Sequence, residues 1–148
     1  DIKPDNIIID KTGKIWLLDF GIARHIDMES LTQSAQHFGL FTLGYASTEQ
    51  FRNLKRDIDI RADLFSIGIV AHELLTGENV YRKNSNDPLA ILKKMEKVSP
   101  PPIKIEGDTQ FQLSAFICMI GDHRRTRRPR TASEAMVIFN NVKETVRV

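Results

Sequence analysis

Residues 1–20 read DIKPDNIIIDKTGKIWLLDF and predict a β-hairpin. Ile7–Ile9 and Ile15–Leu18 are short apolar runs of the kind that form strands. Between them, the segment Asp10-Lys11-Thr12-Gly13 supplies turn residues, and Gly13 is free to take a positive φ. Because the strands of a hairpin are antiparallel, the start of the first and the end of the second lie at the same edge.

Polar residues gather at that edge of the predicted hairpin. Asp1 and Asn6 precede the first strand, Asp19 ends the second, and Lys3 lies beside them. Carboxylate and amide oxygens are ligands suited to Mg²⁺, and a lysine suits a phosphate. Gly21 would let the backbone turn sharply after Asp19. Taken singly, these residues are also typical of turns and strand ends, so only their combination favours a phosphate and magnesium site.

The rest of the chain predicts a long loop followed only by helices. Periodicity disappears between about residues 21 and 44, and a loop of that length is usually functional or disordered. The segment Arg61–Thr76 is apolar on almost every side, which predicts a buried central helix that ends at Gly77.

Three further helices are predicted by caps and apolar spacing. Asp87 and Pro88 open one that runs to about Lys97, ahead of a run of three prolines. A second, largely buried helix covers residues 111–120. The third is an amphipathic helix that follows a capping box formed by Thr131 and Glu134. Its apolar residues are Met136, Phe139 and Val142. Trp16 and the phenylalanines are expected in the core.

Composition excludes several classes of protein. The chain has 148 residues, 21 Lys+Arg against 19 Asp+Glu, and a net charge of +2, which is too small to indicate a nucleic-acid or membrane partner. Its single cysteine, Cys118, excludes an internal disulfide framework and favours a reducing, cytoplasmic setting. The most apolar stretch, residues 64–75, is too short to span a bilayer, so no membrane segment is expected.

Five ordered motifs resemble the protein kinases, specifically the serine/threonine kinases of the bacterial, eukaryotic-like type. They are DIKPDN at residues 1–6, DFG at 19–21, GYASTEQ at 44–50, DLFSIG at 63–68 and RRP at 127–129. In that family they are the catalytic loop from its aspartate onward, the metal-binding motif, the end of the activation segment, the start of the central helix, and the arginine before the last helix.

The resemblance implies a role for each matching residue. Asp1 would orient the substrate hydroxyl, and Lys3 would contact the transferring phosphoryl group of ATP. Asn6 and Asp19 would hold the Mg²⁺ ions. Thr42 matches the threonine of the substrate-binding loop that reaches toward the catalytic aspartate and lysine. The lysine two residues after the aspartate is the serine/threonine pattern, so the implied partner is a protein substrate with Ser or Thr.

Other matching residues have structural roles in the family. Gly21 belongs to the metal-binding motif, Glu49 would pair with Arg128, and the Asp63 carboxylate would accept hydrogen bonds from the catalytic-loop backbone. Without the resemblance, Asp63 is also typical of a first-turn aspartate favoured by the helix dipole. The chain departs from the family at Thr48, where proline is usual, and on both sides of Thr42.

The implied fold is a protein kinase-like α+β fold: a mainly α-helical C-lobe with a small β-hairpin. Residues 1–148 would form a partial kinase domain, with the activation segment at 19–49 and the helical lobe at 50–148. Nothing in these residues resembles the glycine-rich ATP loop, the strand lysine or its partner glutamate, so the N-lobe is expected to be absent. We therefore expect negligible activity from these residues alone, and an exposed apolar face on the central helix.

Other functions stay open at this stage. A pseudokinase or regulatory docking module would use the same lobe without catalysis. A small-molecule phosphotransferase would share the catalytic loop, but it is not expected to have the activation-segment end at 47–49 followed by the Asp63 helix, so a protein substrate is favoured. The arginines at 124, 125, 127, 128 and 130 are dense enough for nucleic acid, but they lack aromatic partners, and a solvated loop with one structural arginine is favoured. Ser30, Thr32 and Ser34 are candidate phosphorylation sites in the activation loop.

Overall fold

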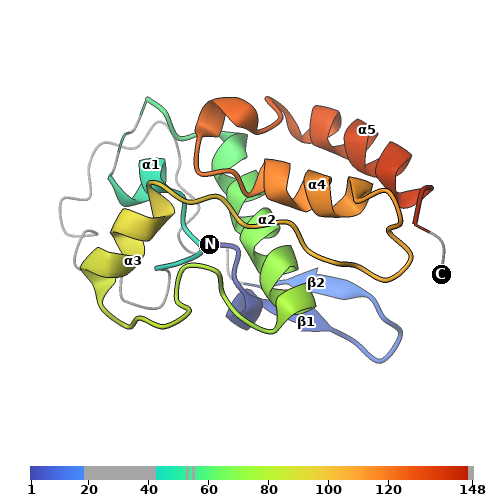
Figure 1. Ribbon diagram of the computed structural model, residues 1–148, viewed down its shortest axis with the longest axis horizontal. Coiled ribbons are helices and arrows are strands. Elements are labelled where there is room, and N and C mark those ends of the chain that lie inside the picture. Colours follow the sequence, from blue (N-terminus) through green and yellow to red (C-terminus); the bar gives the residue numbers. More distant parts are fainter. Residues whose placement is uncertain (19–42, 53, 55, 147–148) are drawn as a thin grey trace.

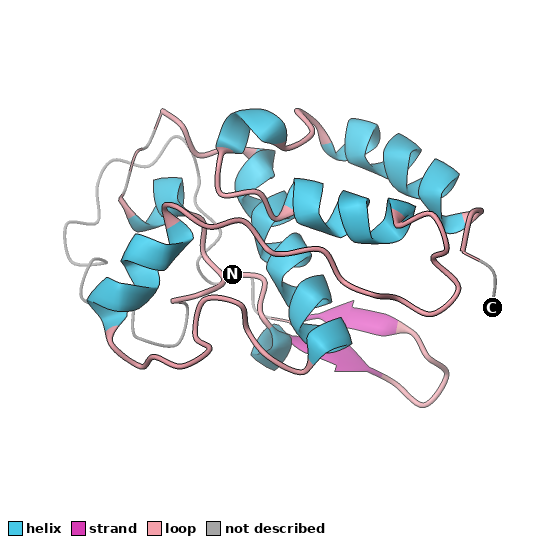
Figure 2. Ribbon diagram, viewed as in Figure 1, coloured by secondary structure: helices cyan, strands magenta, loops and turns pink. Residues whose placement is uncertain are grey.

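The computed structural model describes residues 1–18, 43–52, 54 and 56–146. In these ranges a two-stranded sheet precedes a set of helices: β1 (Ile7–Ile9), β2 (Ile15–Leu17), α1 (Thr48–Phe51), α2 (Ile60–Thr76), α3 (Pro88–Met95), α4 (Gln112–Ile120) and α5 (Ala132–Lys143). Helix α2 runs through the middle, with α4 and α5 on one side, α1 and α3 on the other, and the hairpin beside its C-terminal half (Figure 1). Figure 2 shows that helix dominates and that the only strands described are those of the hairpin. The predicted helical fold with a small hairpin is therefore present.

The hairpin forms with the predicted strands and turn. Strands β1 and β2 are antiparallel, with Ile8 opposite Trp16. Gly13 has φ 81°, and its amide donates to the Asp10 carbonyl at 2.9 Å. The placement of Trp16 in the core was wrong. Its side chain is 48% exposed, its indole Nε1 donates to the Asp10 carboxylate at 2.9 Å, and the Lys14 ammonium lies over its ring.

Helix α2 begins and ends at residues that cap it. The Asp59 carboxylate accepts from the Arg61 amide at 2.9 Å, which satisfies one of the backbone donors that a helix start leaves without a partner. Gly77 ends the helix in the left-handed region, with φ 78°, as predicted. The other predicted caps also form. Asp87 accepts from the first turn of α3, which ends at Met95, and Thr131 Oγ1 accepts from the Glu134 amide at 3.0 Å.

Helix α2 contributes to two apolar clusters on different faces. The first lies toward α1 and α3 and contains Leu43, Tyr45, Phe65, Ile69, Val70, Tyr81, Ile91 and Met95. The second lies toward α4 and α5 and contains Leu64, Phe116, Ile120, Ala135 and Val142. Ile2 and Ile7 pack against the first cluster, so the residues around the start of β1 rest on the central helix. This contact places the polar residues of the hairpin edge beside α2.

Two glycines bring the backbone of α2 close to the backbone at the end of α4. A Cβ added to Gly68 would lie 2.5 Å from the Gly121 amide nitrogen and 2.7 Å from its Cα. These distances are shorter than side-chain contacts allow, and the obstacle is backbone. Gly68 therefore lets the backbones of the central helix and of the end of α4 come into direct contact.

One face of α2 is exposed and apolar, unlike the rest of the helix. Ile60, Ile67 and Leu74 recur at seven-residue spacing and are 39%, 42% and 71% exposed. The expectation of burial on every side was wrong for this face, and the expected exposed apolar face is present. The expectation that the phenylalanines are in the core was wrong for Phe51 and Phe111, and Met136 of α5 faces solvent as well. Within the described ranges, no helix is both long and apolar enough to cross a membrane.

Candidate active site

Three of the predicted site residues, two catalytic and one metal-binding, contact one another at the edge of the hairpin. The Lys3 ammonium lies 2.8 Å from Asp1 Oδ2. The amide nitrogen of Asn6 donates to the Asp1 carbonyl at 2.8 Å and to Asp1 Oδ2 at 3.3 Å. The side chains of Asp1 and Lys3 are 7% and 16% exposed, so the ion pair is shielded from water. The structure therefore brings a carboxylate, an ammonium and an amide together in one small polar cluster.

The local backbone explains why these side chains meet. Residues Pro4–Asn6 form one 3-10 turn, in which the Asn6 amide donates to the Lys3 carbonyl at 3.0 Å. This turn folds Asn6 back toward Asp1. At the same edge of the hairpin, the Leu18 amide donates to the Asn6 carbonyl at 2.7 Å. The end of β2 and the start of β1 therefore lie together, as the sequence predicts.

The two oxygens of the Asp1 carboxylate have different environments. Oδ2 contacts both Lys3 and Asn6, whereas Oδ1 is buried and has no hydrogen-bond partner among the described residues. A buried carboxylate oxygen without a donor is costly, because it has lost its water contacts without replacement. The cost is recovered when a hydroxyl donates to it. Oδ1 is therefore the atom of this cluster whose capacity to accept a hydrogen bond is unused among the described residues.

The residues present fit a magnesium nucleotide. The Asn6 amide nitrogen points at Asp1, which leaves its carbonyl oxygen Oδ1 without a donor among the described residues. Oxygen ligands of this kind are those that Mg²⁺ prefers, and the Lys3 ammonium beside them suits a phosphate. Asp19, the other predicted ligand, directly follows Leu18 in the sequence. Its own position lies outside the described residues.

Asp63 lies in the first turn of α2. Burial raises the pKa of its carboxyl group. No hydrogen bond to the Asp63 carboxylate is formed by the described residues. Its predicted role toward the catalytic-loop backbone stays a prediction.

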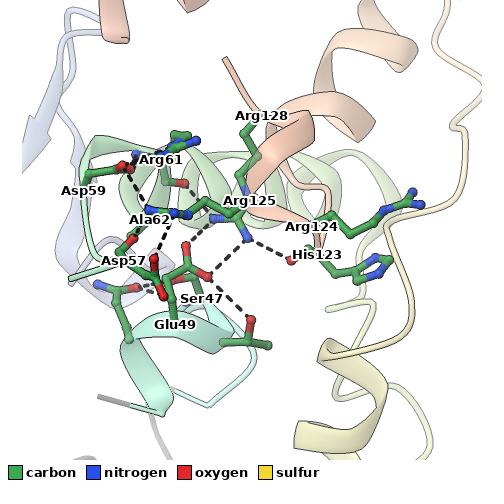
Figure 3. Close-up of polar contacts among 12 residues, drawn as sticks. Ser47, Glu49, Asp57, Asp59, Arg61, Ala62, His123, Arg124, Arg125 and Arg128 are labelled. Atoms are coloured by element: carbon green, nitrogen blue, oxygen red, sulfur yellow. Dashed lines mark hydrogen bonds and ion pairs between the residues drawn. The ribbon is translucent and has the colours of Figure 1, made fainter. Parts of the chain in front are cut away.

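Glu49 and Arg128 form a buried ion pair between α1 and the turn before α5. Arg128 Nη1 lies 2.6 Å from Glu49 Oε1, and the two side chains are 0% and 6% exposed. The same guanidinium donates to three backbone carbonyls, those of Asp122, Arg61 and His123, at 2.7, 3.0 and 3.1 Å. It also lies over the Phe65 ring. Figure 3 shows Arg128 beside Glu49 and His123. These partners satisfy the guanidinium, so its burial is tolerated.

The segment just before α1 is attached to the central helix. The Tyr45 carbonyl accepts from Ser66 Oγ at 2.9 Å, and the Tyr45 hydroxyl donates to Glu73 Oε2 at 2.7 Å. Burial and the Glu73 carboxylate raise the pKa of Tyr45 to about 12. Asn79 donates to the same carboxylate at 3.1 Å. Residues 43–47 are therefore held rigidly against α2.

Several predicted residues lie outside the described ranges. They are Asp19, Gly21, Thr42 and the candidate phosphorylation sites Ser30, Thr32 and Ser34. Thr48, which stands where the family usually has proline, is the first residue of α1 and follows the N-cap Ser47. The Ser47 amide donates to the Gln50 side chain at 2.9 Å, so the short helix starts normally without a proline.

Two sets of contacts were not predicted from the sequence. One is the Tyr45–Glu73 hydrogen bond between the segment before α1 and the central helix. The other is a second set of arginine contacts, in which Arg125 binds Asp57 and Asp59 and Arg124 binds Asp122. The turn expected to hold one structural arginine therefore holds three that are paired. The sequence shows two acidic partners for Arg125, the aspartates at 57 and 59 before α2. Nothing near either segment indicates that they pair with this arginine.

Comparison with known proteins agrees with this arrangement. The sequence profile of the protein kinase domain matches residues 1–137. The chain is similar to the probable serine/threonine-protein kinase PknB of Bifidobacterium longum, with 36% identity over 134 residues. It is similar to PknB of Mycobacterium leprae, with 37% identity over 135 residues, and to human dual specificity mitogen-activated protein kinase kinase 7, with 37% identity over 136 residues.

The aligned regions cover most of this chain but little of its relatives. They include 90%, 90% and 88% of the chain, against 19%, 21% and 30% of the three relatives. The chain thus spans about a fifth of the length of the two bacterial kinases. The resemblance to bacterial serine/threonine kinases, noted from five motifs, is confirmed by these matches. The chain belongs to the protein kinase domain family.

Proposed function

We propose that this chain carries the catalytic loop and helical lobe of a serine/threonine protein kinase, which transfers the γ-phosphoryl group of ATP to Ser or Thr hydroxyls of proteins. The observation that carries the proposal is the cluster of Asp1, Lys3 and Asn6. In this cluster, Lys3 and Asn6 both contact Asp1 Oδ2, whereas Asp1 Oδ1 is buried and has no donor among the described residues. Phosphoryl transfer needs positioned charges of this kind more than covalent catalysis.

Each residue of the cluster has a distinct task in this proposal. Asp1 Oδ1 accepts the hydrogen bond of the attacking hydroxyl and orients its oxygen toward the phosphoryl group. Lys3, held on Asp1 Oδ2, places a positive charge next to the phosphoryl oxygens as negative charge shifts during transfer. Asn6 holds the Asp1 main chain and carboxylate, so the geometry exists before substrate binds.

ATP and Mg²⁺ are the implied cofactors. Asn6 Oδ1 and the Asp19 carboxylate would hold the metal, and Lys3 would bind the nucleotide phosphates. When bound by these ligands, Mg²⁺ would neutralise part of the negative charge of the phosphates. A glycine-rich loop and a strand lysine would contact the rest of the nucleotide. We assign these elements to a part of the protein other than these 148 residues. A cytoplasmic setting follows from ATP as the donor.

Substrate binding is assigned to the segment that ends at α1. Thr42 would contact the substrate hydroxyl together with Asp1 and Lys3, and Gly21 would allow the turn after the metal ligand. The attachment of Tyr45 to α2 supports this assignment, because it holds the residues next to Thr42 against a rigid helix. The Glu49–Arg128 pair would hold the same segment at its other end, and Asp63 would support the catalytic loop.

The experiment uses the full-length gene product with Mg²⁺, ATP and three matched peptides that differ only in a Ser, Thr or Tyr acceptor. We expect phosphate on the Ser and Thr peptides. Lys3→Ala should abolish it, because the charge beside the phosphoryl group is lost. Lys11→Ala is the matched control, since it removes the same charge from the exposed hairpin turn and is expected to leave the rate unchanged.

Two outcomes would contradict the proposal. Transfer confined to the tyrosine peptide would show that the acceptor class is wrong. No transfer by the unmodified protein, with all three peptides and with the protein correctly folded, would favour the docking-module alternative, in which the helical lobe binds a partner without catalysis.

A further inference from the structure

A single turn supplies two arginines to the segment between α1 and α2. Residues Arg125–Arg127 form a 3-10 turn, and Arg128 follows it directly. Figure 3 shows Arg125 and Arg128 with contacts to the same side, where Glu49, Asp57 and Asp59 lie. The family resemblance accounts for Arg128 and its partner Glu49. It gives no role to Arg125.

Arg125 binds main chain as well as side chain. Its Nη1 donates to the Asp57 carbonyl at 2.6 Å, and its Nη2 donates to Asp57 Oδ1 at 2.9 Å. A weaker contact joins Nη1 to Asp59 Oδ2 at 3.4 Å. The planar guanidinium donates to the carbonyl and to the carboxylate of Asp57 at the same time. It therefore fixes both the position and the orientation of the Asp57 backbone.

Backbone hydrogen bonds continue from Asp57 to α1. The Asp57 amide donates to the Leu54 carbonyl at 2.8 Å, and the Leu54 amide donates to the Glu49 carbonyl at 3.0 Å. Glu49 lies on α1 and is held by Arg128. A series of backbone hydrogen bonds therefore joins Asp57 to Glu49. Arg125 binds its Asp57 end, and Arg128 binds its Glu49 end. That series leads directly into residues 43–47, the segment assigned above to substrate binding.

Arg125 contributes less to stability than Arg128 does. Its side chain is 28% exposed, and its partners Asp57 and Asp59 are 48% and 40% exposed, so water screens these ion pairs. The cap of α2 also survives without Arg125, because Asp59 keeps its bonds to the Arg61 amide and guanidinium at 2.9 and 2.6 Å. The specific effect of Arg125 is on the position of Asp57 and of the turn that precedes it.

We propose that Arg125 is a positioning residue for protein-substrate binding: through Asp57 and Leu54 it sets the position of α1 and of residues 43–47. This inference rests on the proposed kinase function. The Asp1–Lys3–Asn6 cluster has no contact with Arg125 or Asp57 among the described residues. Loss of Arg125 therefore affects the affinity for the protein substrate and leaves the affinity for ATP unchanged.

The first test is amide hydrogen exchange of the full-length gene product, because it requires no catalysis. In Arg125→Ala, peptides covering residues 56–59 should exchange about tenfold faster, the effect of losing a hydrogen bond to a charged group. Peptides from α4 should be unchanged. Arg127→Ala is the matched control: it removes the same charge from the same turn, and the Arg127 residue is exposed, with no hydrogen bond or ion pair from its guanidinium to the described residues. Equal exchange in both variants would overturn the proposal.

The second test separates substrate binding from nucleotide binding. Arg125→Ala should raise the KM for the Ser or Thr peptide by about three- to tenfold, the scale of one charge-assisted hydrogen bond at a partly exposed site. The KM for ATP should not change. Arg125→Lys keeps the charge but not the fork, so its KM should lie between those of the unmodified protein and Arg125→Ala. An unchanged peptide KM, or an equal rise in both KM values, would contradict the proposal.

The two tests also separate this inference from the proposed function. Absence of phosphate transfer by the unmodified protein would contradict the kinase function itself. Hydrogen exchange would still decide whether Arg125 holds Asp57. Normal transfer, with no difference between Arg125→Ala and Arg127→Ala in exchange or in KM, would overturn only the role of Arg125.

Discussion

The Arg128 guanidinium lies 2.6 Å from the Glu49 carboxylate, and neither side chain is more than 6% exposed. The two residues come from segments 79 positions apart in the sequence. Because the pair is buried, water does not screen it, and each charge depends on the other for compensation. This relationship connects the end of the segment assigned to substrate binding with the turn before α5.

Removal of one partner should therefore destabilise the chain strongly. In Arg128→Met the Glu49 carboxylate stays buried without its main partner, and we expect a loss of about 3–5 kcal/mol in the free energy of unfolding. Urea unfolding of the chain, followed by circular dichroism, measures it. Arg52→Ala is the control, since Arg52 and Glu96 form a more exposed pair that should contribute less than about 1 kcal/mol. Equal losses in both variants would contradict the account.

Gly68→Ala should destabilise the contact between α2 and α4. Alanine is the better helix former by about 1 kcal/mol, so local propensity alone predicts stabilisation. The added Cβ, however, would lie 2.5 Å from the Gly121 backbone nitrogen, and backbone has little room to shift. We expect a net loss of about 1–3 kcal/mol, as in overpacked cores. An increased midpoint of thermal unfolding would show that the helices are less tightly apposed than described.

Stability should decrease as the pH falls below about 6.5, the ordinary pKa of histidine. Burial lowers the pKa of His72, whose Nε2 lies 3.2 Å from the Pro101 carbonyl and whose Nδ1 is buried without a partner among the described residues. Burial lowers the pKa of His123 as well. The unfolded state therefore binds more protons than the folded state in this range, and acid favours unfolding.

Unfolding midpoints measured between pH 7.5 and pH 5 test this expectation. His72→Gln and His123→Gln should each reduce the slope of stability against pH, and the double variant should reduce it most. A slope that is the same in all four proteins would assign the acid sensitivity to other groups.

The two tyrosines should resist ionisation in the folded chain. The pKa of Tyr45 is raised to about 12 by burial and by Glu73, and burial raises the pKa of Tyr81 further. Ultraviolet titration should show no phenolate near pH 10 while the chain is folded, but phenolate with a pKa near 10 in urea. Because the unfolded tyrosines ionise first, stability is present below about pH 10 and is lost as the pH rises above it. Phenolate near pH 10 in the folded chain would contradict the burial described.

Local features of the fold could be predicted because they depend on neighbouring residues. Gly13 takes its positive φ in the hairpin turn, Gly77 ends α2, and Thr131 caps α5, each for a steric or hydrogen-bonding reason that spans only a few positions. The Asp1–Lys3–Asn6 cluster is also local. It forms within one turn of chain at the edge of the hairpin.

Long-range contacts could not be predicted in the same way. Arg125 and Asp57 are 68 positions apart, and nothing in either segment selects the other, since arginines and aspartates are common throughout the chain. Exposure is also a global property. Trp16 was expected in the core because it is large and apolar, yet its position in a two-stranded sheet leaves it about half exposed. Glu49 and Arg128 were predicted only because the family resemblance connects them.

In the proposed function, Asp1 orients the hydroxyl that attacks ATP. This role is tested most directly by the turnover of Asp1→Asn in the full-length gene product, measured with the Ser or Thr peptide at saturating ATP and Mg²⁺. We expect a turnover reduced by about 10²–10⁴-fold, with the KM for ATP and the unfolding midpoint unchanged. An unchanged turnover in a folded Asp1→Asn protein would contradict this role.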